Sequence, residues 1–141
     1  MSITSVRSYF RARALSVGWK EWKDPFDPEN IPNTVLDNGF QLSPASVGAS
    51  RQNQLDLELP ITQTVRFFKQ GYRDVASGMD SSEASCESFI KSSLKASNRL
   101  TGAGLKNVQL TGLTFEQLGN NNDLIRATMT FNCLVILETE T

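Results

Sequence analysis

The stretch Leu124-Ile-Arg-Ala-Thr-Met-Thr-Phe-Asn-Cys-Leu-Val-Ile-Leu137 decides the fold of this chain. Every second residue from Ile125 onward is apolar, and the residues between them are polar as far as Asn132. Because a β-strand sends successive side chains to opposite faces, this alternation predicts a long strand with one apolar face. Leu134 and Ile136 make both faces apolar near its end, which is typical of a strand covered on both sides. Such a strand needs neighbouring strands and a layer over its apolar face.

Two further stretches alternate in the same way. Residues 55–67 form a second long strand, in which Pro60 marks a bulge or an unpaired edge because it has no N–H to donate. Residues 105–115 change parity at Gly112, which predicts a β-bulge there. A turn of residues 119–123 leads from this strand into the long one, so we expect the last two strands to form a hairpin.

A shorter strand is expected within residues 35–42. It contains Asn38-Gly39, a dipeptide that indicates either a hairpin turn or the end of a short helical turn. Residues 43–54 carry small polar side chains and turn formers with nothing to bury, so we expect a mobile loop.

Two helices are predicted from apolar residues spaced three and four apart. The first covers about residues 3–17 and is ended by Gly18. The second covers residues 74–97, and a capping box at 80–83 indicates that its regular part begins near Ser81. The order is helix, two strands, helix, two strands. We therefore expect an α+β fold, an antiparallel or mixed sheet with both helices packed on its apolar face.

The length of 141 residues indicates a single domain, 1–141, with a proline-rich arm at 19–34 and the mobile loop at 43–54. The net charge of −1 gives no reason to expect a nucleic-acid or membrane binder. No apolar run reaches the length of a membrane span, and the first residues lack the layout of a secretion signal. These features favour folding in a cytoplasm.

Catalytic chemistry has few candidates in this sequence. The chain has no histidine, which excludes Ser-His-Asp and Cys-His catalysis and histidine-ligated zinc. Cys86 and Cys133 fall on predicted apolar faces and are interpreted as buried reduced thiols. Asp24, Asp27 and Glu29 lack the spacing of a calcium loop. We therefore predict no catalytic residue, no cofactor and no metal, and do not expect an enzyme.

Contact with other protein chains has better candidates. Serines at helical spacing on the second helix indicate either a solvated face or a subunit contact. Arginines on the first helix indicate a solvated face or a contact with nucleic acid or an acidic partner. The tryptophans of the arm are either a lid on the core or docking anchors. The candidate interface residues are Arg7, Arg11, Trp19, Trp22, Phe26, Arg51, Ser81, Ser85, Ser88 and Ser92.

The order of these features resembles the tail terminator proteins of long-tailed, non-contractile bacteriophages. The resemblance is carried by the opening helix through Tyr9-Phe10 to Gly18, by Phe26-Asp-Pro-Glu-Asn-Ile-Pro32 and by Thr34-Val-Leu-Asp37. The segment Phe67-Phe-Lys-Gln-Gly-Tyr-Arg-Asp74 and the final hairpin ending in Val135-Ile-Leu137 extend it over most of the chain.

The resemblance implies a structural virion protein without catalysis. Copies would form a homo-oligomer, a hexameric ring with heterologous contacts between neighbours. One face would cap the tail tube protein and stop tube polymerisation, and the other would receive the head connector. DNA would pass through the lumen without specific binding, and no membrane would be involved. The expected location is the head-proximal end of the tail, after assembly in the host bacterial cytoplasm. The alternatives are a neck or head-closure ring protein and a small ligand-binding domain or enzyme.

Overall fold

The computed structural model describes residues 3–22, 37–53, 56–70, 75–95, 98, 107–118 and 124–138. Within them it has two helices, α1 (Ile3–Ser16) and α2 (Val75–Leu94). The strands are β1 (Lys20–Glu21), β2 (Gly39–Leu42), β3 (Ser46–Val47), β4 (Arg51–Asn53), β5 (Asp56–Gln70), β6 (Val108–Leu118) and β7 (Leu124–Glu138). The predicted α+β class is confirmed. The predicted turn at 119–123 and most of the arm lie outside the described residues.

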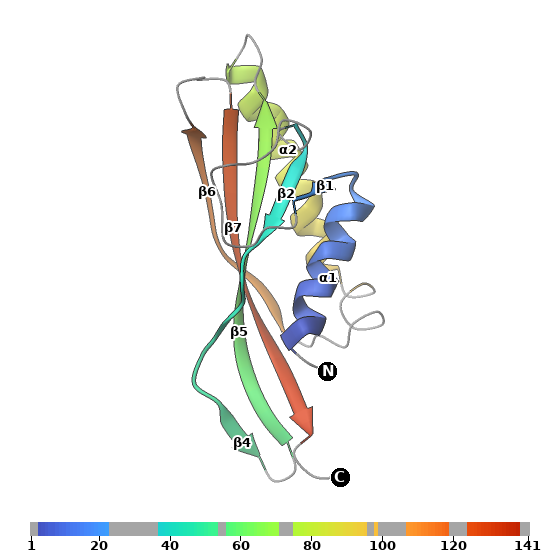
Figure 1. Ribbon diagram of the computed structural model, residues 1–141, viewed down its shortest axis with the longest axis vertical. Helices are drawn as coiled ribbons and strands as arrows, with labels where there is room; N and C mark the ends of the chain where they lie inside the picture. The colour runs from blue at the N-terminus through green and yellow to red at the C-terminus, as the bar shows by residue number, and fades with distance from the viewer. Residues whose placement is uncertain are drawn as a thin grey trace.

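The sheet is mixed and is built on the two long strands β5 and β7. Its order is β1-β2-β5-β7-β6, with β3 and β4 also pairing with β5. β5 and β7 are antiparallel over their whole lengths, from Asp56↔Glu138 to Gln70↔Leu124, and only β1 and β2 are parallel. Figure 1 shows both helices on one face of the sheet, beside its upper part. The lower ends of β5 and β7 continue with β4 as a twisted ribbon (Figure 1).

The core lies between the two helices and the odd-numbered face of β5 and β7. Phe10 of α1 and Phe89 of α2 both contact Phe131 of β7, with ring centroids 4.7 and 5.9 Å apart. Trp19 follows α1 and stacks on Phe67 and Phe89 at 4.2 and 4.7 Å. The alternation of residues 125–135 predicted a strand with one buried face, and this is confirmed: that face packs against the helices.

Residues 43–54 were predicted as a mobile loop, whereas two parts of the segment are strands that pair with β5. Ser46 and Val47 pair with Thr62 and Ile61 of β5, and β4 pairs with residues 56–58. The reason is that a strand ladder is made by backbone groups, which small polar residues carry as well as apolar ones. A pattern of side chains does not show this kind of pairing.

Pro60 lies where the neighbouring strand on one side is interrupted. The Gly48 amide donates to the Pro60 carbonyl at 2.8 Å, so the backbone of Pro60 faces the β3–β4 side of β5. The missing N–H of Pro60 thus points toward the gap between β3 and β4, and the pairing with Leu134 of β7 is unaffected. Pro60 therefore forms neither a bulge nor an unpaired edge, but lies between the residues of β5 that pair with β3 and those that pair with β4.

Two further local predictions need correction. α2 begins at Val75, so the proposed start near Ser81 is wrong, and the capping-box residues lie inside the helix. Asn38 has a φ of 61° at the start of β2, and its carbonyl accepts from the Lys20 amide at 2.8 Å. Asn38-Gly39 is therefore not a hairpin turn but opens the parallel pairing of β1 with β2, and the alternative of a helical turn before it lies outside the described residues.

Gly18 ends α1 as predicted. Its φ is +90°, its amide donates to the Leu15 carbonyl at 3.1 Å, and the Trp19 amide donates to the Ala14 carbonyl at 3.1 Å. This pair of hydrogen bonds is a Schellman motif, in which a left-handed residue turns the chain out of the helix. The motif carries Trp19 back over the core.

Replacing Gly18 with alanine should lower the free energy of unfolding by about 1–2 kcal/mol, because a Cβ is disfavoured in the left-handed conformation. An added Cβ meets nothing within 4 Å, so the cost comes from the backbone alone. Gly112→Ala is the matched control, since its Cβ also meets nothing and its φ is not in that region. Urea denaturation of both variants checks this; equal stabilities of the two would contradict it.

The bulge at Gly112 is confirmed. Leu110 pairs with Phe131 and Gly112 pairs with Thr130, so β6 has one extra residue, Thr111, in this interval. The extra residue changes the parity, so Leu110 and Leu113 point to the same face of the sheet. As a result β6 presents apolar side chains to the helical face from Val108 to Phe115.

Candidate functional site

The candidate functional site is the outer edge of the sheet, formed by β6 together with α2. β6 ends the strand order, and no other strand of the described ranges pairs with its outer side. Its residues, Val-Gln-Leu-Thr-Gly-Leu-Thr-Phe-Glu-Gln-Leu, include no lysine, arginine or proline. Proteins commonly protect edge strands with such residues, because an open edge is a template for another strand. The bulge at Gly112 is the protective feature that β6 does have.

The backbone groups that face outward from β6 can be assigned from the pairing. The Leu134 amide donates to the Asn107 carbonyl at 3.3 Å, so Asn107 faces β7. In an antiparallel pair the facing alternates along the strand, so Val108 and Leu110 face outward. Beyond the bulge the register assigns Leu113 and Phe115 to the outside, and Thr114 and Glu116 to β7. Each outward residue offers an N–H and a C=O to an added strand.

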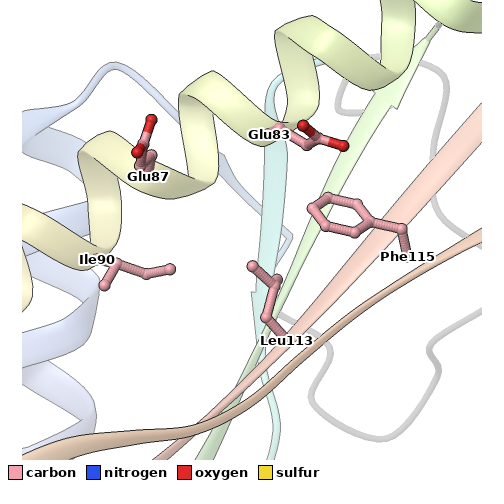
Figure 2. Close-up of a pocket in the computed structure, with 5 residues that line it drawn as sticks. All are labelled: Glu83, Glu87, Ile90, Leu113 and Phe115. Atoms are coloured by element: carbon pink, nitrogen blue, oxygen red, sulfur yellow. The ribbon is translucent and has the colours of Figure 1, made fainter.

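A groove runs between α2 and the outer half of β6. Its lining is Glu83, Glu87 and Ile90 from α2 and Leu113 and Phe115 from β6, and its volume is about 310 Å³. Figure 2 shows Ile90, Leu113 and Phe115 facing the space between helix and strand. The Glu83 carboxylate points toward the Phe115 ring, whereas that of Glu87 turns away from the strand (Figure 2). The groove has an apolar floor with two carboxylates on one rim.

The spacing of residues on α2 explains this arrangement. Ser82, Cys86, Phe89 and Ser93 are buried against the sheet. Residues 83, 87 and 90 follow them by one position, about 100° around the helix, and therefore lie on one flank. Leu113 on β6 remains 37% exposed beneath that flank, which makes it one of three large apolar side chains in the described chain with so much exposure. Helix and strand thus leave an apolar strip uncovered at the sheet edge.

The residues predicted as docking anchors do not lie together. Trp19 is only 5% exposed and belongs to the core, so the lid interpretation holds for it and the anchor interpretation is wrong. Trp22 is half-buried, and its amide donates to the Phe40 carbonyl at 2.8 Å. Phe26 lies outside the described residues, and so does the Arg51 side chain. These residues do not converge on one site.

The arginines of α1 serve mainly to hold that helix. Arg11 forms an ion pair with Glu21 at 2.9 Å and so ties α1 to β1. The Arg13 guanidinium lies over the Tyr9 ring, 5.9 Å from its centroid. Arg7 is half-buried and has no ion pair with a described residue. As contacts for an acidic partner, Arg7 and Arg11 stay a prediction.

The serine ridge lies on the flank of α2 opposite the groove. Ser81, Ser85 and Ser92 are half-buried and Ser88 is exposed. They precede the buried stripe by one position, whereas the groove residues follow it, so the two sets flank the core on opposite sides. A subunit contact there stays a prediction, and the ridge does not contribute to the groove.

The uncovered face of the sheet is polar and internally paired. Arg126 of β7 donates from Nε to Glu116 of β6 at 2.8 Å, and Thr62 donates to Asn132 at 3.0 Å. Arg66 donates to the Ser43 hydroxyl, and burial together with the neighbouring Arg126 lowers the pKa of its guanidinium. These contacts satisfy the side chains within the sheet.

The two thiols are buried and free, as predicted. Burial raises the pKa of Cys86 and of Cys133 from the ordinary 9.0 to about 12. Thiolate is the reactive form of cysteine, so neither group is a nucleophile at neutral pH.

Alkylating reagents should therefore modify Cys86 and Cys133 only after unfolding. Because both pKa values are raised in the folded state, the thiols stabilise the fold fully below pH 9 and lose this contribution as the pH rises from 9 to 12. Mass spectrometry of native and urea-treated protein after iodoacetamide, together with denaturation at alkaline pH, checks both points. Rapid modification of the native protein would contradict the burial of these thiols.

Sequence reasoning missed the groove. It assigned Glu83 to a capping box and treated residues 113–115 only as the continuation of a strand beyond Gly112. A signal was present, because the first strand of a final hairpin often lies at a sheet edge and this one has no charged residue between Lys106 and Glu116. The pattern does not reveal which edge a helix leaves uncovered. None of the described helices is long and apolar enough to cross a membrane.

Comparison with known proteins gives structural matches only. No protein-family model matches the sequence, and the search of curated proteins finds no match. The type 4 fimbrial biogenesis protein PilO from Pseudomonas aeruginosa is similar with a TM-score of 0.43 and 11% identity, over 96% of this chain and 68% of that chain. The core region of PilO from the type IV pilus system of the same organism has a TM-score of 0.34 and 14% identity, over 72% and 83%.

These findings correct the resemblance drawn from the sequence. The structures found belong to type IV pilus biogenesis proteins, and no phage tail terminator is matched. The predicted identity as a tail terminator or head-to-tail joining protein is therefore wrong, and so is the predicted location in a virion. The features behind it were an opening helix, a proline-rich arm and long strands. Elements of these kinds occur in many α+β proteins, and none of them carries a specific chemistry.

Proposed function

We propose that this protein is a non-catalytic assembly protein that binds other protein chains by adding a strand to the outer edge of β6. The observation that supports this most directly is the edge itself: eleven residues without proline or basic side chains. Beside its outward backbone groups, β6 also carries an exposed apolar side chain, that of Leu113. Strand addition draws affinity from main-chain hydrogen bonds and specificity from alternate side chains. β6 offers both.

The absence of catalysis is part of the proposal. The two thiols are held protonated by burial. The carboxylates of the groove sit on an exposed helical flank, and in the described chain they have no base, acid or cation beside them within ion-pair distance. General acid–base catalysis needs groups whose environments separate their roles. The groove is better suited to hold a side chain than to transform a substrate.

Self-association is proposed as one use of the same edge. Two open edges of identical chains pair readily in antiparallel fashion, because each supplies the groups that the other lacks. Such a contact would extend the sheet from one copy to the next. The homo-oligomer predicted from the sequence is retained in this form, without a stated number of copies.

The mass of the protein in solution, measured by light scattering over a range of concentrations, tests this use of the edge. We expect the mass to rise with concentration, and Leu113→Lys to shift the transition to at least about tenfold higher concentration, because a charge is placed on the apolar strip. Val47→Lys is the matched control, since Val47 is 43% exposed and belongs to β3. An equal effect of the two substitutions, or a monomer at every concentration, would contradict self-association through β6.

A further inference from the structure

We infer that the strand received by β6 is basic: its side chains on the helical side of the sheet include lysine or arginine next to apolar residues. This inference rests on the proposed function, because it assumes that β6 takes up a strand. The groove would bind an extended basic segment of another protein chain.

The charge of the groove comes from two carboxylates without a counterion. Glu83 and Glu87 are both exposed, and neither forms an ion pair with any residue that the structure describes. The ion pairs that are formed elsewhere, at Glu21, Asp37 and Glu116, involve neighbouring strands or loops. Lys91 lies one turn beyond Glu87 but does not pair with it. The rim of the groove therefore attracts positive charge.

The direction of the incoming side chains follows from strand geometry. An added strand would lie about 4.8 Å outside β6. Residues directly opposite Leu113 and Phe115 would send their side chains to the same face as these two, the helical face. They would therefore enter the groove beneath the flank that carries Glu83 and Glu87 (Figure 2). A long basic side chain can cover the apolar floor with its stem and reach the rim with its charge.

A second copy of this chain does not supply such a strand through its own β6, whose charged residue is Glu116. Pairing of two β6 edges would thus leave the four glutamates of two grooves without positive partners. The charge of the groove favours a partner of different sequence over a second copy. The inference therefore names a heterotypic partner as the better occupant of the edge.

The test uses two short synthetic peptides of equal length, binding being followed by fluorescence anisotropy. In the first, threonines alternate with valine and lysine; in the second, glutamate replaces lysine. Each exposed charge pair changes affinity by about 1.4- to 5-fold. We expect the lysine peptide to bind at least about fivefold more tightly than the glutamate peptide, and high salt to reduce the difference by screening.

Three variants make the test specific to the groove. The double substitution Glu83→Gln with Glu87→Gln should remove most of the difference between the peptides. Lys91→Gln is the matched control on the same helix, and it should strengthen binding of the lysine peptide or leave it unchanged. Leu113→Pro, which removes an outward N–H from β6, should weaken binding of both peptides.

The outcomes separate the inference from the proposed function. Equal binding of both peptides, abolished by Leu113→Pro, would overturn the basic strand but leave strand addition standing. Binding of the lysine peptide that survives Leu113→Pro would place the peptide elsewhere and overturn the inference. If neither peptide binds, the inference is overturned; if, in addition, wild-type protein and Leu113→Lys have the same mass at every concentration, the proposed function falls with it.

Discussion

Replacing Trp19 with alanine should lower the free energy of unfolding by about 3–5 kcal/mol, the range found when a large aromatic side chain is removed from a core. Trp19 is 5% exposed and stacks on Phe67 of β5 and Phe89 of α2, so its removal leaves a cavity where sheet, α1 and α2 meet. Proteins of this size are stable by about 5–15 kcal/mol, so the loss is a large part of the total. Urea denaturation measures it.

Leu15→Ala is the control for this prediction. Leu15 belongs to α1, four residues before Trp19, but is 53% exposed. Its removal should change the free energy of unfolding by no more than about 0.5 kcal/mol. A loss below about 1 kcal/mol for Trp19→Ala would show that the tryptophan does not close the core, and would reopen its interpretation as a partner anchor.

Replacing Leu113 with proline should remove the binding function while leaving the fold in place. The Leu113 N–H is assigned to the outer side of β6, so the proline ring takes the place of a donor that no described strand uses. Proline is tolerated on edge strands in this orientation. We expect self-association and peptide binding to weaken by at least about tenfold, because one main-chain hydrogen bond and the apolar contact of Leu113 are both lost.

Thr114→Pro separates the two sides of the strand. Thr114 is directly opposite Thr128, and its N–H is assigned to the ladder with β7. Proline there removes a ladder hydrogen bond and leaves a carbonyl unsatisfied, at a cost of about 1–3 kcal/mol in stability. Urea denaturation and binding are measured on both variants. If Leu113→Pro unfolds the protein more readily than Thr114→Pro does, the assignment of the outer side is wrong.

Much of the fold follows from local patterns in the sequence. The alternation around Met129 predicts β7 and its buried face, because the pattern of burial is imposed by the strand itself. Gly18 predicts a helix end, because it marks a backbone geometry that other residues disfavour. Gly112 predicts a bulge, because the parity of the apolar residues changes there. The burial of both cysteines follows in the same way from the face on which each lies.

Other features depend on neighbours that the local pattern does not contain. β3 and β4 exist because β5 offers an edge beside them, and their own side chains give no sign of pairing. α2 extends back to Val75 in spite of Gly78, as tertiary context can override helix propensity. The groove arises because α2 does not cover Leu113. How far the helical layer extends over the sheet is not encoded in the local sequence pattern of β6. The family resemblance failed because element order alone does not distinguish one α+β protein from another.

Hydrogen exchange of the β6 amides tests the central claim most directly. In dilute protein the amides of Leu110, Leu113 and Phe115 should exchange quickly, and those of Thr114 and Glu116, which face β7, should exchange slowly. When the lysine peptide is added, or the concentration is raised into the range of self-association, the first set should become protected and the second should change little. Protection of Leu113 and Phe115 already in the dilute protein, or no change on binding, would contradict the proposal that β6 is an open edge for an added strand.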